Sequence, residues 1–206
     1  MNETRGTSVH GDAEARRRGT LDAAAALLDE GGYAALTIRR VAQRAGTSTG
    51  LIYQYFADKQ DIFISLLDES QAASADFVAA LPRGEGVAAL IETVIPESAR
   101  QWKRVLRMTA AWRDTTGIGE RDERASVQRL RTSSERYLTE LRRAIVEAAD
   151  GEGRTLRQDP AMLRFVVSGL VGVSDALVNH WEEDLDATEL ITFAAAAIAR
   201  GITAEP

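Results

Sequence analysis

Apolar residues recur at intervals of three and four along most of this chain and seldom alternate with polar ones. This spacing collects apolar side chains on one face of an α-helix, whereas a half-buried strand requires strict alternation. A chain of 206 residues, 45% of them hydrophobic, is also long enough to bury a substantial core. The sequence therefore predicts an all-α protein.

Glycines and capping residues divide the first part of the chain into four helices. We expect a first helix over residues 12 to 30, with a stop at Gly31 and Gly32, where a chain reversal needs no Cβ. Three later residues carry an oxygen that can accept a hydrogen bond from the first turn of a helix: Thr37, Ser48 and Asp58. The helices that follow them are expected to end at Gly46, Tyr55 and Pro82.

The rest of the chain continues as helices separated by glycine-rich turns. We expect Pro96 to start a helix rather than to kink one. Further helices are expected near residues 121 to 149, from 160 to 182, and from Asp186 to Gly201.

The segment TIRRVAQRAGTSTGLIYQYFADK, residues 37 to 59, consists of a helix, a glycine turn and a second helix that begins with small and polar residues. This is the helix-turn-helix pattern, in which the second helix lies in the major groove of DNA. Small side chains at Thr49 and Gly50 allow a close approach to the base edges, and Leu51 can touch a thymine methyl group. Lys59 suits a phosphate. The segment therefore predicts DNA binding.

The same segment closely resembles the DNA-binding signature of the TetR family of bacterial transcriptional regulators. The matching residues are Thr37, Val41-Ala42, Ala45-Gly46, Ser48, Gly50, Ile52-Tyr53, Tyr55-Phe56 and Lys59. The resemblance covers about residues 13 to 65. It implies base contacts from Arg39, Thr49, Gly50 and Tyr53, with Leu51 and Gln54 in addition, and phosphate contacts from Thr37, Tyr55 and Lys59. With Arg40 and Ser48, these residues form the predicted DNA-binding set.

The resemblance also implies a helical ligand-binding and dimerisation domain after the DNA-binding unit. We therefore predict a disordered tail over residues 1–11, a helix-turn-helix domain over 12–57, and a ligand-binding and dimerisation domain over 58–206. The resemblance to the TetR family further implies a transcriptional regulator, more commonly a repressor. Such a regulator binds a pseudo-palindromic operator and responds to a small-molecule effector.

The helix expected over residues 160 to 182 is apolar on nearly every face, so one chain cannot cover both of its sides. With the small residues of 193 to 201 it can pair with a second copy as a four-helix bundle, although a fully internal helix of a monomer is the alternative. The predicted interface of the homodimer consists of Phe165, Val166, Gly169, Val173, Ala194, Ala197 and Ile198.

Aromatic, soft and polar residues on the later helices are candidates for an effector pocket, although such residues at helical spacing also form plain core. They are Trp102, Met108, Trp112, Tyr137, Asp175, Asn179 and Trp181. Asp175 directly follows ten uncharged residues, and it can face water, pair with an arginine or hold a cationic ligand.

The charge pattern fits selective rather than indiscriminate binding of nucleic acid. The net charge is −6, but residues 1 to 60 hold eight basic and seven acidic residues, so the acidic excess lies in the remainder. A neutral to basic unit on an acidic body can touch phosphates at a few chosen points.

Other classes of protein lack the residues that they need. The expected folded region has one histidine, His180, and the chain has no cysteine, so we predict no catalytic site, no metal and no cofactor. A helical adaptor that binds protein through residues 165 to 181 leaves the segment 37 to 59 unexplained. The N-terminal residues lack an apolar run, and residues 165 to 174 fall short of the roughly 20 needed to cross a bilayer, so we expect a cytoplasmic protein.

Overall fold

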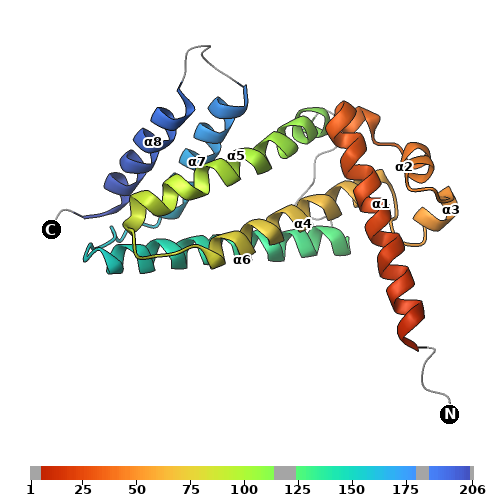
Figure 1. Ribbon diagram of the computed structural model, residues 1–206, viewed down its shortest axis with the longest axis horizontal. Coiled ribbons are helices and arrows are strands. Elements are labelled where there is room, and N and C mark those ends of the chain that lie inside the picture. Colours follow the sequence, from red (N-terminus) through yellow and green to blue (C-terminus); the bar gives the residue numbers. More distant parts are fainter. Residues whose placement is uncertain (1–5, 114–123, 180–185, 205–206) are drawn as a thin grey trace. The chain divides into compact units, whose positions relative to one another are not determined.

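The computed structural model describes residues 6–113, 124–179 and 186–204, with side chains from residues 12–101, 124–179 and 186–204. Its described part contains α-helices and one isolated β-bridge, between Leu156 and Thr203, so the all-α prediction is confirmed. Figure 1 shows the helices in chain order. They are α1 (Gly6–Ala35), α2 (Ile38–Arg44), α3 (Thr49–Ile52), α4 (Lys59–Ala80), α5 (Gly86–Arg113), α6 (Ala125–Gly151), α7 (Met162–Asn179) and α8 (Ala187–Ile202).

Helix α1 has a kink where the sequence predicts a stop. Gly31 and Gly32 leave helical geometry, and Gly32 has a φ of 61°, a conformation that a residue with a Cβ rarely adopts. The start of α1 differs from the prediction, because the helix begins at Gly6 rather than at Asp12. Residues 6 to 11 of the expected tail are therefore helical, and residues 1 to 5 lie outside the described part.

The predicted caps of α2, α3 and α4 are confirmed. The backbone N–H of Arg40 donates to Thr37 Oγ1 at 3.2 Å, that of Leu51 to Ser48 Oγ at 3.1 Å, and that of Asp61 to Asp58 Oδ1 at 2.8 Å. Helix α3 ends at Ile52, three residues before the expected end, because the chain tightens into three-residue hydrogen bonds there, such as Tyr55 N–H to the carbonyl of Ile52.

Pro96 lies inside α5, so the prediction that it starts a helix is wrong. A proline within a helix removes one backbone hydrogen bond and costs about 3 kcal/mol. Several apolar side chains before it are buried in the core, among them Ile91, Val94 and Ile95. Since burial of one such side chain contributes about 1.5–3 kcal/mol, tertiary packing outweighs the local penalty.

The chain forms two compact units, one of residues 1–68 and 106–130 (unit 1) and one of residues 69–105 and 131–206 (unit 2). The boundary falls inside α4, α5 and α6. These units are defined by contacts within the fold, and functional domains can have other boundaries. The domains 12–57 and 58–206 therefore stay a prediction.

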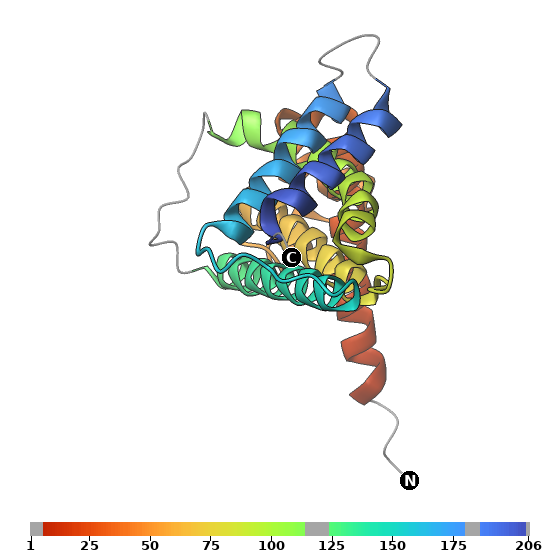
Figure 2. The same cartoon turned by 90° about the vertical axis from the view of Figure 1, so that its left-hand side faces the viewer.

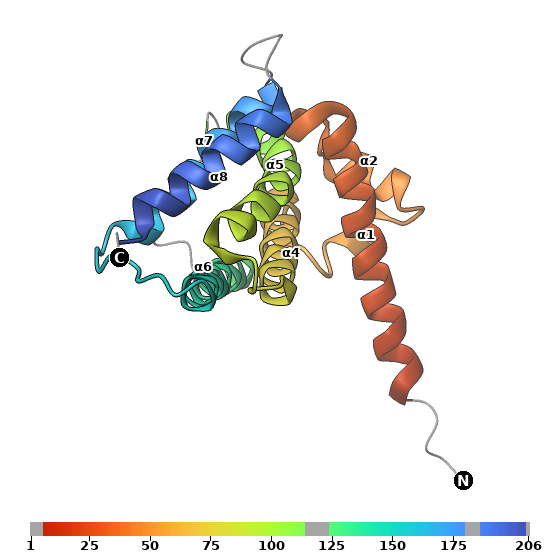
Figure 3. The ribbon, with the colours of Figure 1, turned by 60° about the vertical axis from the view of Figure 1, so that its left-hand side comes forward.

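Each unit has its own core. In unit 1, α1, α2, α3 and the first part of α4 bury Leu21, Val41, Ile52 and Phe63, and Figure 3 shows α2 beside α1. In unit 2, the core lies among α4, α5, α6, α7 and α8. Figure 2 shows α7 and α8 running side by side, and an added Cβ at Gly169 would lie 3.1 Å from Ile198 Cδ1. A glycine at this point therefore permits the close approach of the two helices.

Candidate nucleic-acid interface

The apolar faces of α2 and α3 are held against the core of unit 1. Val41, Ala42 and Ile52 are buried, as is Phe56 just after α3. Below them, the rings of Tyr33 and Phe63 meet edge to face with centroids 5.2 Å apart. This packing leaves the opposite faces of α2 and α3 directed at solvent.

Most of the predicted DNA-binding residues lie on that exposed surface. Leu51, Tyr55 and Lys59 are half-buried, and the remaining eight are exposed: Thr37, Arg39, Arg40, Ser48, Thr49, Gly50, Tyr53 and Gln54. Tyr53 is 58% exposed, whereas Tyr55 packs against the core of unit 1. The two tyrosines therefore point to different sides of the chain, and the side chain of Tyr53 is the one exposed for a contact with a base edge.

Two predicted contacts also build the motif. The hydroxyl oxygens of Thr37 and Ser48 accept backbone hydrogen bonds at the starts of α2 and α3. Each hydroxyl keeps its own O–H, which can donate to a phosphate oxygen. The same side chain can thus fix a helix terminus and contact the DNA backbone.

Two carboxylates accept backbone hydrogen bonds at the N-terminus of α4. Asp61 Oδ2 accepts from the N–H of Ala57 at 3.0 Å, and Asp58 caps the helix and lies 3.5 Å from Arg124. Lys59 Nζ lies 4.4 Å from the centroid of the Tyr33 ring. A phosphate here would therefore be held by the Lys59 ammonium rather than by the helix terminus.

One ion pair engages Arg44, an exposed arginine of α2 that lies outside the predicted DNA-binding set. Arg44 on α2 binds Glu30 on α1 with both arms of its guanidinium, at 2.8 and 2.6 Å. The hydrogen bond from Arg44 lowers the pKa of Glu30 and raises that of Arg44. Arg44 thus links α1 to α2 within unit 1.

Sequence reasoning missed three arginines on α1 that lie in the same unit: Arg16, Arg17 and Arg18. Arg16 and Arg18 are exposed, and Arg16 lines a surface hollow together with Thr47 and Leu51, beside the start of α3. Arg17 Cζ lies 5.5 Å from the centroid of the Phe56 ring. The run of three consecutive basic residues in the sequence is the signal that could have identified them. These arginines are candidate phosphate contacts.

The predicted effector-pocket residues do not form one group in the described part. Tyr137 lies at a cavity of unit 2, but Asp175 and Asn179 do not line it. Asp175 Oδ1 instead accepts a hydrogen bond from Asn179 Nδ2 at 2.8 Å. The side chains of Trp102, Met108, Trp112 and Trp181 lie outside the described residues.

The predicted dimer interface is divided between core and surface. Val166, Ala194 and Ile198 are buried within the chain itself, in the core of unit 2. Gly169, Val173 and Ala197 are half-buried, and Phe165 is 51% exposed. Sequence reasoning missed Phe193 on α8, which is 69% exposed and lies on the outer side of that helix.

The exposed reading helix, the capped turn and the basic side chains define the class of this protein as a helix-turn-helix DNA-binding protein. Residues 21–66 match the family model for bacterial regulatory proteins of the tetR family. Residues 21–66 of this chain are thus similar to the regulators of that family. This similarity favours a regulator over the adaptor and the enzyme.

Relatives of known class match the same region. The regulator HbdR of Aromatoleum sp. (strain CIB) is 50% identical over 54 residues, which are 26% of this chain and 24% of HbdR. The repressor AcnR of Corynebacterium diphtheriae is 38% identical over 64 residues, 31% of this chain and 34% of AcnR. The chain thus spans about a quarter to a third of the length of these relatives.

The likeness in fold extends over nearly the whole chain. The crystal structure of the regulator FadR from Bacillus subtilis, in complex with stearoyl-CoA, has a TM-score of 0.61 and 18% identity. The match covers 90% of this chain and 98% of FadR. The second, helical part of this chain therefore has the fold of a regulator of known structure.

Proposed function

We propose that this protein is a repressor that binds a pseudo-palindromic operator as a homodimer and is released from it by a small molecule. The observation that carries the proposal is the exposed surface of α3 and of the turn that follows it, where Thr49, Gly50, Tyr53 and Gln54 are exposed beside capped and buried neighbours. A dimer seated on a promoter blocks access to it, which is the simplest way for a compact DNA-binding protein to control transcription. Because DNA is the target, the place of action is the cytoplasm.

Two copies are needed because one short reading helix contacts only a few base pairs. A two-fold axis presents two such helices to successive major grooves, about 34–36 Å apart or a multiple of that spacing. The exposed Phe165 on α7 and Phe193 on α8 support an interface on these two helices, since large apolar side chains exposed to water favour association.

Helix α7 adds a second argument for a partner on this face. It is 18 residues long with a mean hydropathy of 1.4, and 22% of it is buried within the chain. A helix of this length and composition can also cross a bilayer. Its buried residues Val166, Leu170 and Ser174 face the core of unit 2, so we assign the remaining apolar surface to a second copy.

Two measurements test the proposal. Genomic fragments selected by the protein should contain an inverted repeat, and their retardation in a gel should weaken steeply as salt rises. Sedimentation should give a dimer, and Phe193→Asp should shift it toward monomer and weaken operator binding. Selected fragments without inverted repeats would exclude the palindromic operator. If the protein sediments as a monomer, or floats with lipid vesicles, the proposed dimer interface on α7 and α8 is wrong.

A further inference from the structure

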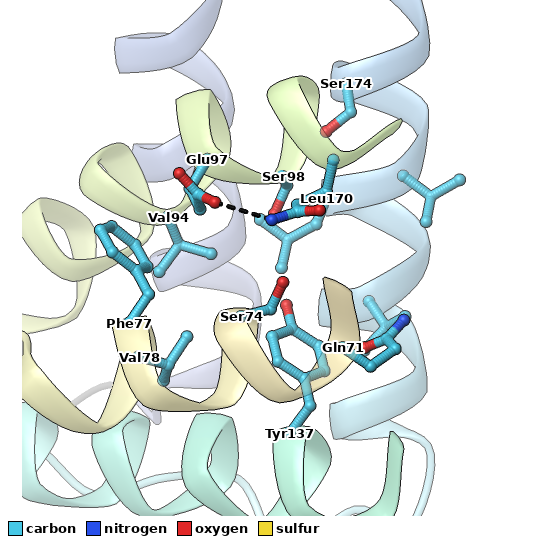
Figure 4. Close-up of a pocket in the computed structure, with 13 residues that line it drawn as sticks. Gln71, Ser74, Phe77, Val78, Val94, Glu97, Ser98, Tyr137, Leu170 and Ser174 are labelled. Carbon is cyan, nitrogen blue, oxygen red and sulfur yellow. Dashed lines mark hydrogen bonds between the residues drawn. The ribbon is translucent and has the colours of Figure 1, made fainter. Parts of the chain in front are cut away.

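A cavity of about 180 Å³ lies within unit 2, between α4, α5, α6 and α7. Figure 4 shows the side chains that converge on it. Most of its wall is apolar and includes Phe77, Val78, Val94, Val167 and Leu170. An engineered cavity of about 150 Å³ holds one benzene molecule, so this one suits a compound with one or two rings.

Several polar groups of the cavity are neutral hydroxyls. Tyr137 is hydrogen-bonded to Ser98, and burial raises the pKa of the Tyr137 phenol, which is therefore protonated at neutral pH. Ser174 is 1% exposed and is one of the residues that line the cavity, and its buried Oγ has no hydrogen-bond partner among the described residues. A buried hydroxyl without a partner is unfavourable, so a ligand oxygen beside Ser174 would gain a hydrogen bond that the empty cavity lacks.

The charges around the cavity disfavour an anion. Among the described residues that line it, Glu97 is the one with a charge at neutral pH, and no lysine, arginine or histidine is present. The Glu97 carboxylate accepts from Gln101 Nε2 at 3.0 Å, the bond drawn in Figure 4, and from Arg100, which lies outside the lining. Among the described lining residues, a carboxylate or phosphate placed here would find no counter-charge, and it would be repelled by the carboxylate of Glu97.

We infer that the effector is an uncharged, compact and mostly apolar molecule with a hydroxyl or carbonyl oxygen that binds Ser174, and that it is not a carboxylate or a CoA thioester. The inference rests on the proposed ligand-controlled regulator and adds the chemical class of the ligand. It departs from the stearoyl-CoA bound to the structurally similar FadR, because 18% identity carries the fold and not the lining of a cavity.

The test compares matched neutral and acidic probes on the full-length protein by calorimetry: benzyl alcohol with benzoate, 2-naphthol with 2-naphthoate, and decanoyl-CoA alone. We expect one of the neutral probes to bind at least about tenfold more tightly than its acid partner, as a buried charge without a partner requires. If no neutral probe binds more tightly than its acid, or if decanoyl-CoA binds most tightly, the inference is wrong.

Two serines of α7 provide the variant and its control. Ser174→Ala should lower the affinity for the alcohol about threefold to tenfold, the usual contribution of one hydrogen bond. The affinity for naphthalene, which has no oxygen, should stay the same. Ser168→Ala, at an exposed position of the same helix, should change neither. Equal effects of both substitutions would show that Ser174 does not bind the ligand.

Operator retardation of the ligand-free protein separates the two proposals. If the protein retards operator DNA but binds no neutral probe, the proposed chemical class of the effector is wrong and the proposed DNA-binding regulator stands. Neutral-probe binding without any retardation would keep the ligand class and refute the proposed function.

Discussion

Unit 1 and unit 2 place their functional groups in opposite ways. The reading surface of unit 1 is exposed, and hydrogen bonds between residues three apart, from Arg40 to Thr37 and from Leu51 to Ser48, fix its helices. The cavity of unit 2 is formed by helices that lie far apart in the chain, and its Tyr137 and Ser98 are 39 positions apart. A surface built locally tolerates change elsewhere, whereas a cavity between distant helices depends on the packing of every wall.

The largest effect should come from a core substitution in unit 1. Phe63→Ala removes a fully buried ring that contacts Tyr33, and we expect a loss of about 3–5 kcal/mol in the free energy of unfolding, measured by denaturant titration. Because this core supports α2 and α3, operator binding should also fall.

Ile91→Ala in unit 2 is the matched control for Phe63→Ala. Ile91 is equally buried, so a loss of about 2–5 kcal/mol is expected, but the folded variant should keep operator affinity. Loss of operator binding by folded Ile91→Ala would contradict the separation of the two units.

Substitutions on the reading surface should change DNA binding and leave stability nearly unchanged. Tyr53→Ala removes an exposed side chain, and operator affinity should fall by about 1–3 kcal/mol while affinity for random DNA stays the same. Competition binding with both duplexes measures the difference.

Lys59→Ala is the contrasting variant on the same surface. Its effect should be equal on operator and random DNA, and the dependence of affinity on salt should drop by about one unit per protomer. If Tyr53→Ala and Lys59→Ala act alike on both duplexes, the division into base and phosphate contacts is incorrect.

Two helix caps allow the units to be compared with the same chemistry. Ser48→Ala and Asp186→Ala each remove a cap, of α3 and α8 respectively, and each should cost about 0.5–2 kcal/mol of stability. Only Ser48→Ala should also reduce operator binding. A similar loss of DNA affinity in Asp186→Ala would show that operator binding depends equally on α8.

The smallest effect should come from the pair of Glu30 and Arg44 on the surface of unit 1. The folded state lowers the pKa of Glu30 below its ordinary 4.5, so the pair stabilises the fold above that pH, and the stabilisation is lost as the pH falls through the lowered pKa. Glu30→Gln should therefore be slightly less stable than the parent at pH 7 and equal to it in strong acid. A difference that persists in strong acid would assign the effect to packing instead.

The sequence by itself determined the features that depend on near neighbours. Thr37, Ser48 and Asp58 cap helices through hydrogen bonds that span three residues, and Gly32 supplies a conformation that other residues avoid. The residues that match the TetR signature lie in one short segment, so their order alone predicts a common surface.

Tertiary structure decided the features that depend on distant residues. Pro96 stays inside α5 because Ile91 and Ile95 are buried, which local propensity does not register. The apolar pattern of residues 160 to 182 predicted two covered sides, but not that Val166 would belong to the core while Phe165 stays exposed. The periodicity of a helix determines which residues share a face, and this depends only on near neighbours in the sequence. Which element packs against each face depends on distant parts of the chain, and this packing places Ser174 at a cavity.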